Sequence, residues 1–119
     1  MASQKSEKVL EEMVELSVQT IKIIEPMALP RSVKDQLTRS ITSIGANFSE
    51  AQDASSKKDF LNKIYIAKKE ASETKYWLAI VMRLIEEDSA QLKDIQQRVQ
   101  KFTMMLQKIV NTSKESNRT

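Results

Sequence analysis

The sequence predicts an all-α protein, folded as an antiparallel up-down-up-down four-helix bundle. Its 119 residues contain one glycine and two prolines, whereas average usage is about 7% glycine and about 5% proline. A protein built from sheets needs turn residues at intervals of about 8–12 positions, so their scarcity argues against strands. Apolar residues instead recur at helical spacing in four segments. Short connections join these segments, and they place consecutive helices antiparallel.

The first helix is expected from about Glu7 to Glu25. Pro26 ends it, because the residue before a proline avoids the helical conformation. The second helix is expected to start at Ser32, since Ser32 and Asp35 match a Ser-x-x-Asp capping box. The apolar sides of these two helices comprise Val9, Leu10, Met13, Leu16, Val18, Ile21 and Ile24, then Val33, Leu37, Ile41, Ile44 and Phe48.

The third and longest helix is expected from about Lys57 to Glu87, with Ser56 as its cap. Asp88 or Ser89 is expected to cap the fourth helix. Their apolar sides comprise Phe60, Ile64, Ala67, Ala71, Thr74, Leu78, Val81 and Ile85, then Leu92, Ile95, Val99, Phe102, Leu106 and Ile109. By length the chain forms one domain, predicted over residues 1–112, with a polar and disordered tail over 113–119.

The composition limits the possible chemistry. The chain has neither cysteine nor histidine, so thiolate nucleophiles, disulfides, common zinc sites and histidine bases are excluded. Charged residues interrupt the apolar positions at the N-terminus, which predicts neither a signal peptide nor a membrane span. We therefore expect a cytoplasmic protein that is not an enzyme, with no metal, no cofactor and no membrane partner.

The only glycine, Gly45, lies inside the second predicted helix, although glycine costs about 1 kcal/mol in a helix interior. Together with Thr38, Thr42 and Ser49 it forms a stripe of small residues, which predicts close approach of a neighbouring helix. Polar residues border the other flank of this helix. Among them, Asn47 and Glu50 are expected to act as a polar clamp between helices rather than as a catalytic pair.

The third helix carries a second set of apolar residues, roughly 100–150° from its core-facing side. A helix that is apolar on two sides buries both, so this side is predicted to be a subunit interface. The alternative is a broad buried face within a monomer. Two carboxylates on this side would then need partners. The predicted interface comprises Ile66, Glu70, Glu73, Trp77, Ile80 and Leu84.

Positive charge is concentrated in the middle of the chain. The net charge is +3 and the pI is about 9.2; residues 31–83 carry ten Lys and Arg against six Asp and Glu. This pattern fits either a nucleic-acid surface or a solvated helix face. No aromatic ladder is expected beside these cations, so sequence specificity is not indicated. The candidate phosphate contacts are Arg31, Lys34, Lys57, Lys58, Lys68, Lys69 and Lys75.

Two stretches carry a family resemblance: LPRSVKDQLTRSITSIGANFSEAQDASSKKDF at 29–60 and IYIAKKEASETKYWL at 64–78. They resemble the bacterial four-helix bundle family, also called the 23S rRNA intervening-sequence protein family. The matching positions are Leu29-Pro30, Gln36-Leu37-x-Arg39, Ser43-Ile44-x-Ala46-Asn47-x-x-Glu50-Ala51, Ser56-Lys57-Lys58-Asp59-Phe60, Ile66-Ala67 and Glu73. Gly45 stands where the family often has proline.

The resemblance implies a bundle that assembles into a ring, usually a homopentamer. It also implies kinship with the accessory variability protein of diversity-generating retroelements, a basic pentamer that binds a reverse transcriptase and nucleic acid. Two functions therefore remain open. One is a non-catalytic oligomeric scaffold that associates with RNA, DNA or a ribonucleoprotein. The other is a protein-binding adaptor, for example to a reverse transcriptase, without nucleic-acid contact.

Overall fold

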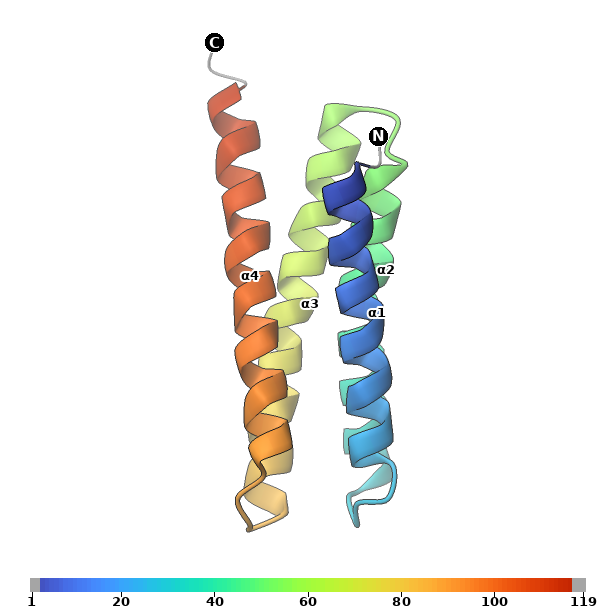
Figure 1. Cartoon of the computed structure of the whole chain (residues 1–119), viewed down its shortest axis with the longest axis vertical. Coiled ribbons are helices and arrows are strands. Elements are labelled where there is room, and N and C mark those ends of the chain that lie inside the picture. The colour runs from blue at the N-terminus through green and yellow to red at the C-terminus, as the bar shows by residue number, and fades with distance from the viewer. Residues whose placement is uncertain (1–2, 117–119) are drawn as a thin grey trace.

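Four α-helices make up the computed structural model, which describes residues 3–116: α1 (Gln4–Ile24), α2 (Arg31–Gln52), α3 (Lys57–Leu84) and α4 (Ala90–Ser116). Each helix runs antiparallel to the one before it (Figure 1). Residues 3–116 contain no strand, and the elongated bundle measures 51 × 23 × 21 Å. The predicted all-α fold with four packed helices is therefore confirmed.

The start of α2 differs from the expectation. The helix begins at Arg31 with Pro30 as its N-cap, and no side chain caps it. The capping box predicted at Ser32 and Asp35 is therefore wrong. The carbonyl of Pro30 instead accepts from the amides of Val33 and Lys34, at 3.1 and 3.2 Å. Asp35 forms an ion pair with Arg31 at 3.2 Å.

The caps of α3 and α4 follow the sequence. Ser56 accepts a hydrogen bond from the amide of Asp59 at 3.0 Å, and Ser89 accepts one from the amide of Leu92 at 3.1 Å. The helix α3 ends at Leu84 rather than near Glu87, and Glu86 adopts a φ of 59°. Such left-handed residues commonly terminate helices.

The end of α4 lies beyond the predicted domain boundary. The helix continues to Ser116, so residues 113–116 extend α4 where the sequence predicts a polar tail. The rest of that tail, 117–119, lies outside the described residues.

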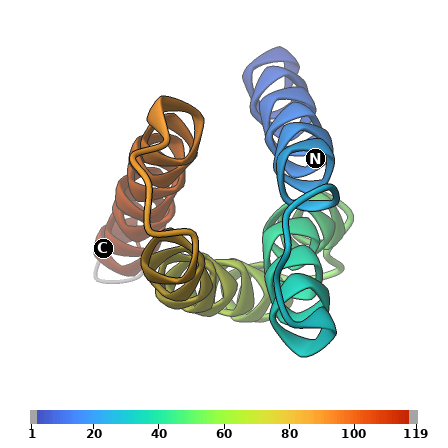
Figure 2. The same cartoon turned by 90° about the horizontal axis from the view of Figure 1, so that it is seen from below.

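The core lies where the predicted apolar sides meet, with Leu37, Ile64, Ala71 and Leu78 fully buried. Val18 is an exception, because it is 43% exposed. Its neighbour Ser17 is buried instead and donates to the Ile41 carbonyl at 3.2 Å. The helices follow one another around the bundle, and α1 meets α4 along its most sparsely packed side (Figure 2), where Arg98 donates to Gln19 at 2.6 Å. Residues on the outer side of α1 therefore face solvent.

The small-residue stripe of α2 allows α1 to approach closely, and the approach is close at Gly45. A Cβ at position 45 would lie 3.3 Å from Met13 Cβ and 3.9 Å from Leu10 Cδ1, both on α1. Gly45 is buried, whereas Thr42 is exposed. The glycine therefore fixes the distance between α1 and α2 at this point.

We expect Gly45→Val to lower the free energy of unfolding by about 1–3 kcal/mol, because its branched side chain would overlap Met13 and Leu10. Ala46→Val is the matched control, since Ala46 is exposed on the same helix and valine costs about 0.5 kcal/mol in a helix. Urea denaturation of both variants measures the difference. Equal losses would show that the two helices are not closely apposed at Gly45.

Candidate functional site

Arg39 on α2 joins two carboxylates of α3. Its NH1 donates to Glu70 Oε2 at 2.8 Å, and its NH2 group donates to Glu73 Oε1. Its Nε donates to Gln36 Oε1 at 3.2 Å, within α2. All three arms of the guanidinium are thus used, and the rigid fork of arginine suits such simultaneous contacts. We call Arg39, Glu70, Glu73 and Trp77 the Arg39 cluster.

Trp77 completes this cluster by donating from Nε1 to Glu73 Oε1 at 3.3 Å. The hydrogen bond from Arg39, and secondly that from Trp77, lowers the pKa of Glu73 below its ordinary value. Hydrogen bonds to Glu73 and Glu70 raise the pKa of Arg39. Arg39 and Glu73 therefore keep their charges at neutral pH.

The predicted second side of α3 is partly covered within the chain. Glu70 is 7% exposed, and the partner that its burial requires is Arg39. Ile66, Trp77 and Ile80 are half-buried, and Leu84 is 49% exposed. Leu84, at the C-terminal end of α3, is thus the most exposed apolar residue of this side.

A buried hydroxyl pair lies next to the Arg39 cluster. Thr74 Oγ1 donates to Ser40 Oγ at 2.9 Å, linking α3 to α2, and also lies 2.8 Å from the Glu70 carbonyl. Both residues are fully buried. Small hydroxyl side chains allow the two helices to approach closely while their polar atoms remain satisfied. The interface between α2 and α3 therefore contains both the Arg39 cluster and the buried Ser40–Thr74 hydrogen bond.

The two predicted clamp residues behave differently. Glu50 forms an ion pair with Lys63 of α3 at 3.5 Å, so it does link the two helices. The Asn47 amide instead donates to the carbonyl of Ser43 at 2.9 Å, inside α2. The hydrogen bond of Asn47 therefore supports its own helix rather than an interhelix clamp.

The candidate basic residues do not form one cluster. Arg31 and Lys34 lie in the first turn of α2, whereas Lys57 and Lys58 lie in the first turn of α3, at the opposite end of the bundle. Arg31 pairs with Glu25 at 3.4 Å and with Asp35, and Lys34 donates to the Glu25 carbonyl at 2.7 Å. Arg31 and Lys34 thus connect the start of α2 to Glu25 at the end of α1.

Lys68 and Lys75 lie on the side of α3 that faces α4. Lys75 Nζ donates to Gln100 Oε1 at 2.9 Å. These two helices border an open hollow of about 520 Å³, which is lined by Lys75, Gln96, Gln97, Gln100 and Lys101. Its lining residues carry only positive or neutral side chains.

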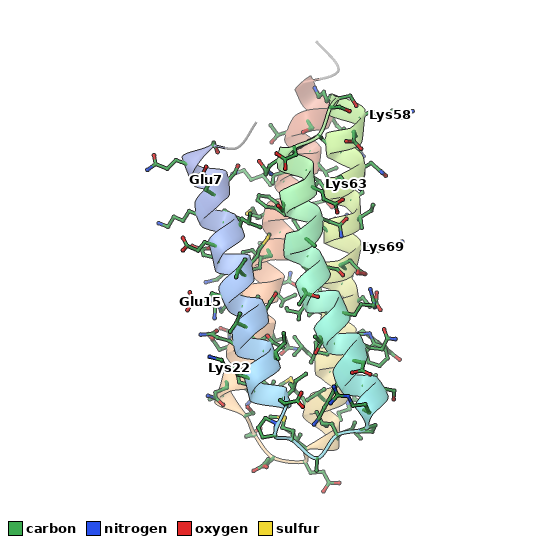
Figure 3. The ribbon with its side chains drawn as sticks, turned by 90° about the vertical axis from the view of Figure 1, so that its right-hand side faces the viewer. Glu7, Glu15, Lys22, Lys58, Lys63 and Lys69 are labelled. Carbon is green, nitrogen blue, oxygen red and sulfur yellow. The ribbon has the colours of Figure 1, made fainter. Side chains whose placement is uncertain are left out.

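Lys58 and Lys69 project outward from α3 (Figure 3). The exposed residues Tyr65, Tyr76 and Arg83 belong to the same outward side of this helix, by their spacing at 100° per residue. Two exposed tyrosines thus lie beside these cations on one side of α3, an arrangement that the sequence-based expectations do not include. The intervals of 7, 4, 7 and 7 residues from Lys58 to Arg83 are the signal that reveals it.

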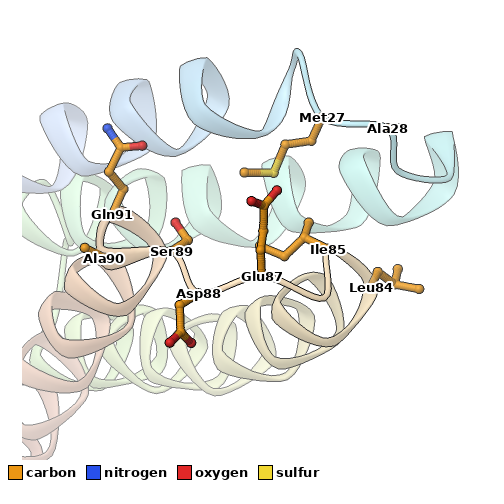
Figure 4. A pocket seen from close by; sticks show the side chains of 9 residues that line it. All are labelled: Met27, Ala28, Leu84, Ile85, Glu87, Asp88, Ser89, Ala90 and Gln91. Atoms are coloured by element: carbon orange, nitrogen blue, oxygen red, sulfur yellow. The ribbon is translucent and has the colours of Figure 1, made fainter.

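A further hollow, of about 540 Å³, lies where the α1–α2 and α3–α4 connections meet (Figure 4). Met27 and Ala28 border it from one connection, and Glu87, Asp88 and Ser89 from the other. Among residues 3–116, no group of three or more metal-ligating side chains comes together. No helix in the described part of the chain is long and apolar enough to cross a membrane.

We expect Arg39→Met to lower the free energy of unfolding by about 1–3 kcal/mol, because it leaves the buried Glu70 carboxylate without its partner. The matched control is Arg31→Met. Both ion pairs of Arg31 are exposed, so this change should cost less than about 1 kcal/mol. Urea denaturation compares the two.

Adding Glu70→Met to Arg39→Met should restore part of the lost stability, since two well-packed apolar residues can replace a buried ion pair. Equal losses for Arg39→Met and Arg31→Met would contradict a stabilising role for the Arg39 cluster.

Comparison with known proteins gives a family and a structural neighbour. The family model of the 23S rRNA-intervening sequence protein matches residues 5–108. A crystal structure from Bacteroides thetaiotaomicron VPI-5482, described as a protein of unknown function from the S23 ribosomal protein family, superposes with a TM-score of 0.78. It is 34% identical, and the match covers 86% of this chain and 97% of that chain. A search of curated proteins found no match.

The family model spans most of the chain, and the structural neighbour shares its helical architecture over nearly its whole length. This chain therefore belongs to the 23S rRNA-intervening sequence protein family.

Proposed function

We propose that this protein is a non-catalytic, self-associating helical bundle that binds nucleic acid through the basic surface of α3 and α4. The observation that carries this proposal is the charge distribution between helices. The helix α3 has seven Lys and Arg against three Asp and Glu, and residues 95–114 of α4 include four basic residues and no carboxylate. A surface of one sign attracts a polyanion over a long range.

The contrast with α1 strengthens the proposal. This helix carries Glu7, Glu11, Glu12 and Glu15 against three lysines, and Glu7 and Glu15 lie along its outer side (Figure 3). Two of the three carboxylates of α3, Glu70 and Glu73, bind Arg39 and face α2. Carboxylates thus predominate on α1, and those of the Arg39 cluster are bound to Arg39, which leaves the remaining cations of α3 and α4 suited to contact phosphate groups.

The names of the relatives agree with a function that involves nucleic acid. The family is named after a 23S rRNA intervening sequence, and the neighbour is assigned to a ribosomal protein family. RNA is therefore the first nucleic acid to test.

We expect the protein to retain labelled RNA at about 50 mM salt and to lose affinity steeply towards about 200 mM, because phosphate contacts release counterions. Lys68→Glu/Lys75→Glu should weaken binding and flatten the salt dependence. Lys8→Glu/Lys22→Glu on α1 is the charge-matched control and should have little effect. Fluorescence anisotropy measures all three proteins. An absence of RNA and DNA binding at about 50 mM salt would overturn the nucleic-acid proposal and favour the adaptor.

Self-association is proposed through the open end of the second side of α3, and a ring of five is the form that the family resemblance suggests. Leu84 is 49% exposed there, close to the half-buried Ile80 and Trp77. Contiguous apolar patches mark interaction sites, and Leu84 continues the half-buried apolar stripe to an exposed end. The adaptor alternative uses the same feature, with a reverse transcriptase or another protein as the partner.

Light scattering should give a mass near five subunits for the natural chain. Leu84→Glu should lower that mass, because a carboxylate would be placed in an apolar contact. Met104→Glu is the control, since Met104 is 63% exposed on α4. A monomeric natural chain would overturn self-association, and an unchanged mass of Leu84→Glu would exclude this interface.

A further inference from the structure

We propose that one exposed stripe of α3 binds single-stranded nucleic acid, with bases stacked on two tyrosines and phosphates held by the cations between them. The stripe comprises Lys58, Tyr65, Lys69, Tyr76 and Arg83, and we call it the tyrosine stripe. The inference rests on the proposed nucleic-acid function and specifies the ligand as an unpaired strand.

The spacing places these five residues in one line. At about 100° per residue, the intervals of 7, 4, 7 and 7 keep them within about 40° of one another on the helix surface. With a rise of about 1.5 Å per residue, the line extends for about 38 Å. All five residues are exposed, with Tyr65 at 39% and Tyr76 at 61%. Cations and aromatic rings alternate along its whole length.

Both rings are held in place by neighbours. The Tyr76 and Trp77 ring centroids are 5.2 Å apart at an interplanar angle of 76°, and Trp77 is itself hydrogen-bonded to Glu73. Lys114 Nζ lies 5.6 Å from the centroid of Tyr65, which adds a further cation from α4. A ring that is already positioned loses little conformational freedom when a base stacks on it.

Two carboxylates, Asp59 and Glu73, lie near the stripe, but in the described part of the chain neither forms an ion pair with its cations. Among the side chains described, Lys58, Lys69 and Arg83 form no ion pair. Lys68 and Lys75 lie close by on the same helix and add to the positive charge. These groups are therefore suited to bind phosphates on either side of a stacked base.

An open hollow of about 520 Å³ lies beside the first ring of the stripe. Lys58, Asn62 and Tyr65 line it together with Ser56, Asp59 and Leu61. Its wall thus combines an aromatic ring, an ammonium group, the Asp59 carboxylate and an amide that can both donate and accept hydrogen bonds. Splayed-out bases are recognised by stacking on aromatic rings and by hydrogen bonds to their edges.

The chemistry favours a single strand over the other polyanions. Bases in a duplex are stacked on one another, whereas those of a single strand are free to stack on aromatic side chains. The interaction should tolerate many sequences, because every base has an aromatic face.

The test compares labelled probes of about 16 nucleotides, within the range that single-strand sites cover: an RNA, the DNA of the same sequence, and the RNA paired with its complement. Fluorescence anisotropy at low salt should show tighter binding of the single strands than of the duplex. The tighter of the RNA and DNA probes identifies the type of strand.

Tyr65→Ala/Tyr76→Ala should weaken single-strand binding by about 5-fold to 150-fold for each lost stacking contact. Tyr65→Phe/Tyr76→Phe should retain the affinity, because stacking needs the ring and not the hydroxyl. Met104→Ala, at an exposed position of α4, is the control and should bind like the natural chain. Circular dichroism checks folding, and the single variant Tyr76→Ala replaces the double variant if that one is unfolded.

Equal binding of single strand and duplex would overturn the inference, as would unchanged binding by the alanine variants. In either case the cations would still support the broader proposal. If the natural chain binds no nucleic acid at all, the proposed function itself fails, and the two failures are thereby distinguished.

Discussion

The contact of Arg39 with Glu70 and Glu73 organises the centre of this molecule. Glu70 is almost fully buried on α3, and a buried carboxylate is strongly unfavourable unless a cation and hydrogen bonds compensate it. Arg39 can compensate the Glu70 carboxylate only when α2 has one particular axial position and rotation relative to α3. The Ser40–Thr74 hydrogen bond requires the same arrangement. Apolar packing would allow several registers between these helices, whereas the buried polar groups favour one.

The register of α2 and α3 in turn determines which side of each helix faces outward. The carboxylates of the Arg39 cluster bind Arg39 of α2, so the outward side of α3, roughly 60–120° away from them on the helix surface, retains cations and the two tyrosines. Gly45 contributes to the placement of α1, because a Cβ at this position would lie 3.3 Å from Met13 Cβ, closer than an ordinary contact. Acidic α1 and basic α4 flank the open side of the bundle (Figure 2). The distribution of charge on the surface is thus a consequence of contacts in the interior.

The helices and most of the core could be predicted from the sequence, because they depend on local signals. Ser56 and Ser89 cap the expected helices, and the apolar spacing identifies Leu37, Ile64 and Leu78 as core. The errors arise where tertiary contacts outweigh local patterns. Ser17 rather than Val18 faces the core, and the carbonyl of Pro30 replaces the expected cap at Ser32. The sequence also does not identify Arg39 as the partner of Glu70, since 31 positions separate the two residues. The tyrosine stripe differs from these cases: its spacing is present in the sequence, but only the structure shows that its residues are exposed.

The position of Trp77 has a practical consequence. It is the only tryptophan in the chain, and it contacts both the Glu73 carboxylate and the Tyr76 ring. Its emission is therefore sensitive to two events at once, the loosening of α2 from α3 and the arrival of an aromatic group at Tyr76. Polarity at the indole nitrogen shifts the wavelength, whereas a stacked base nearby quenches the intensity. The protein thus contains its own optical probe, and unlabelled ligands can be screened with the natural chain.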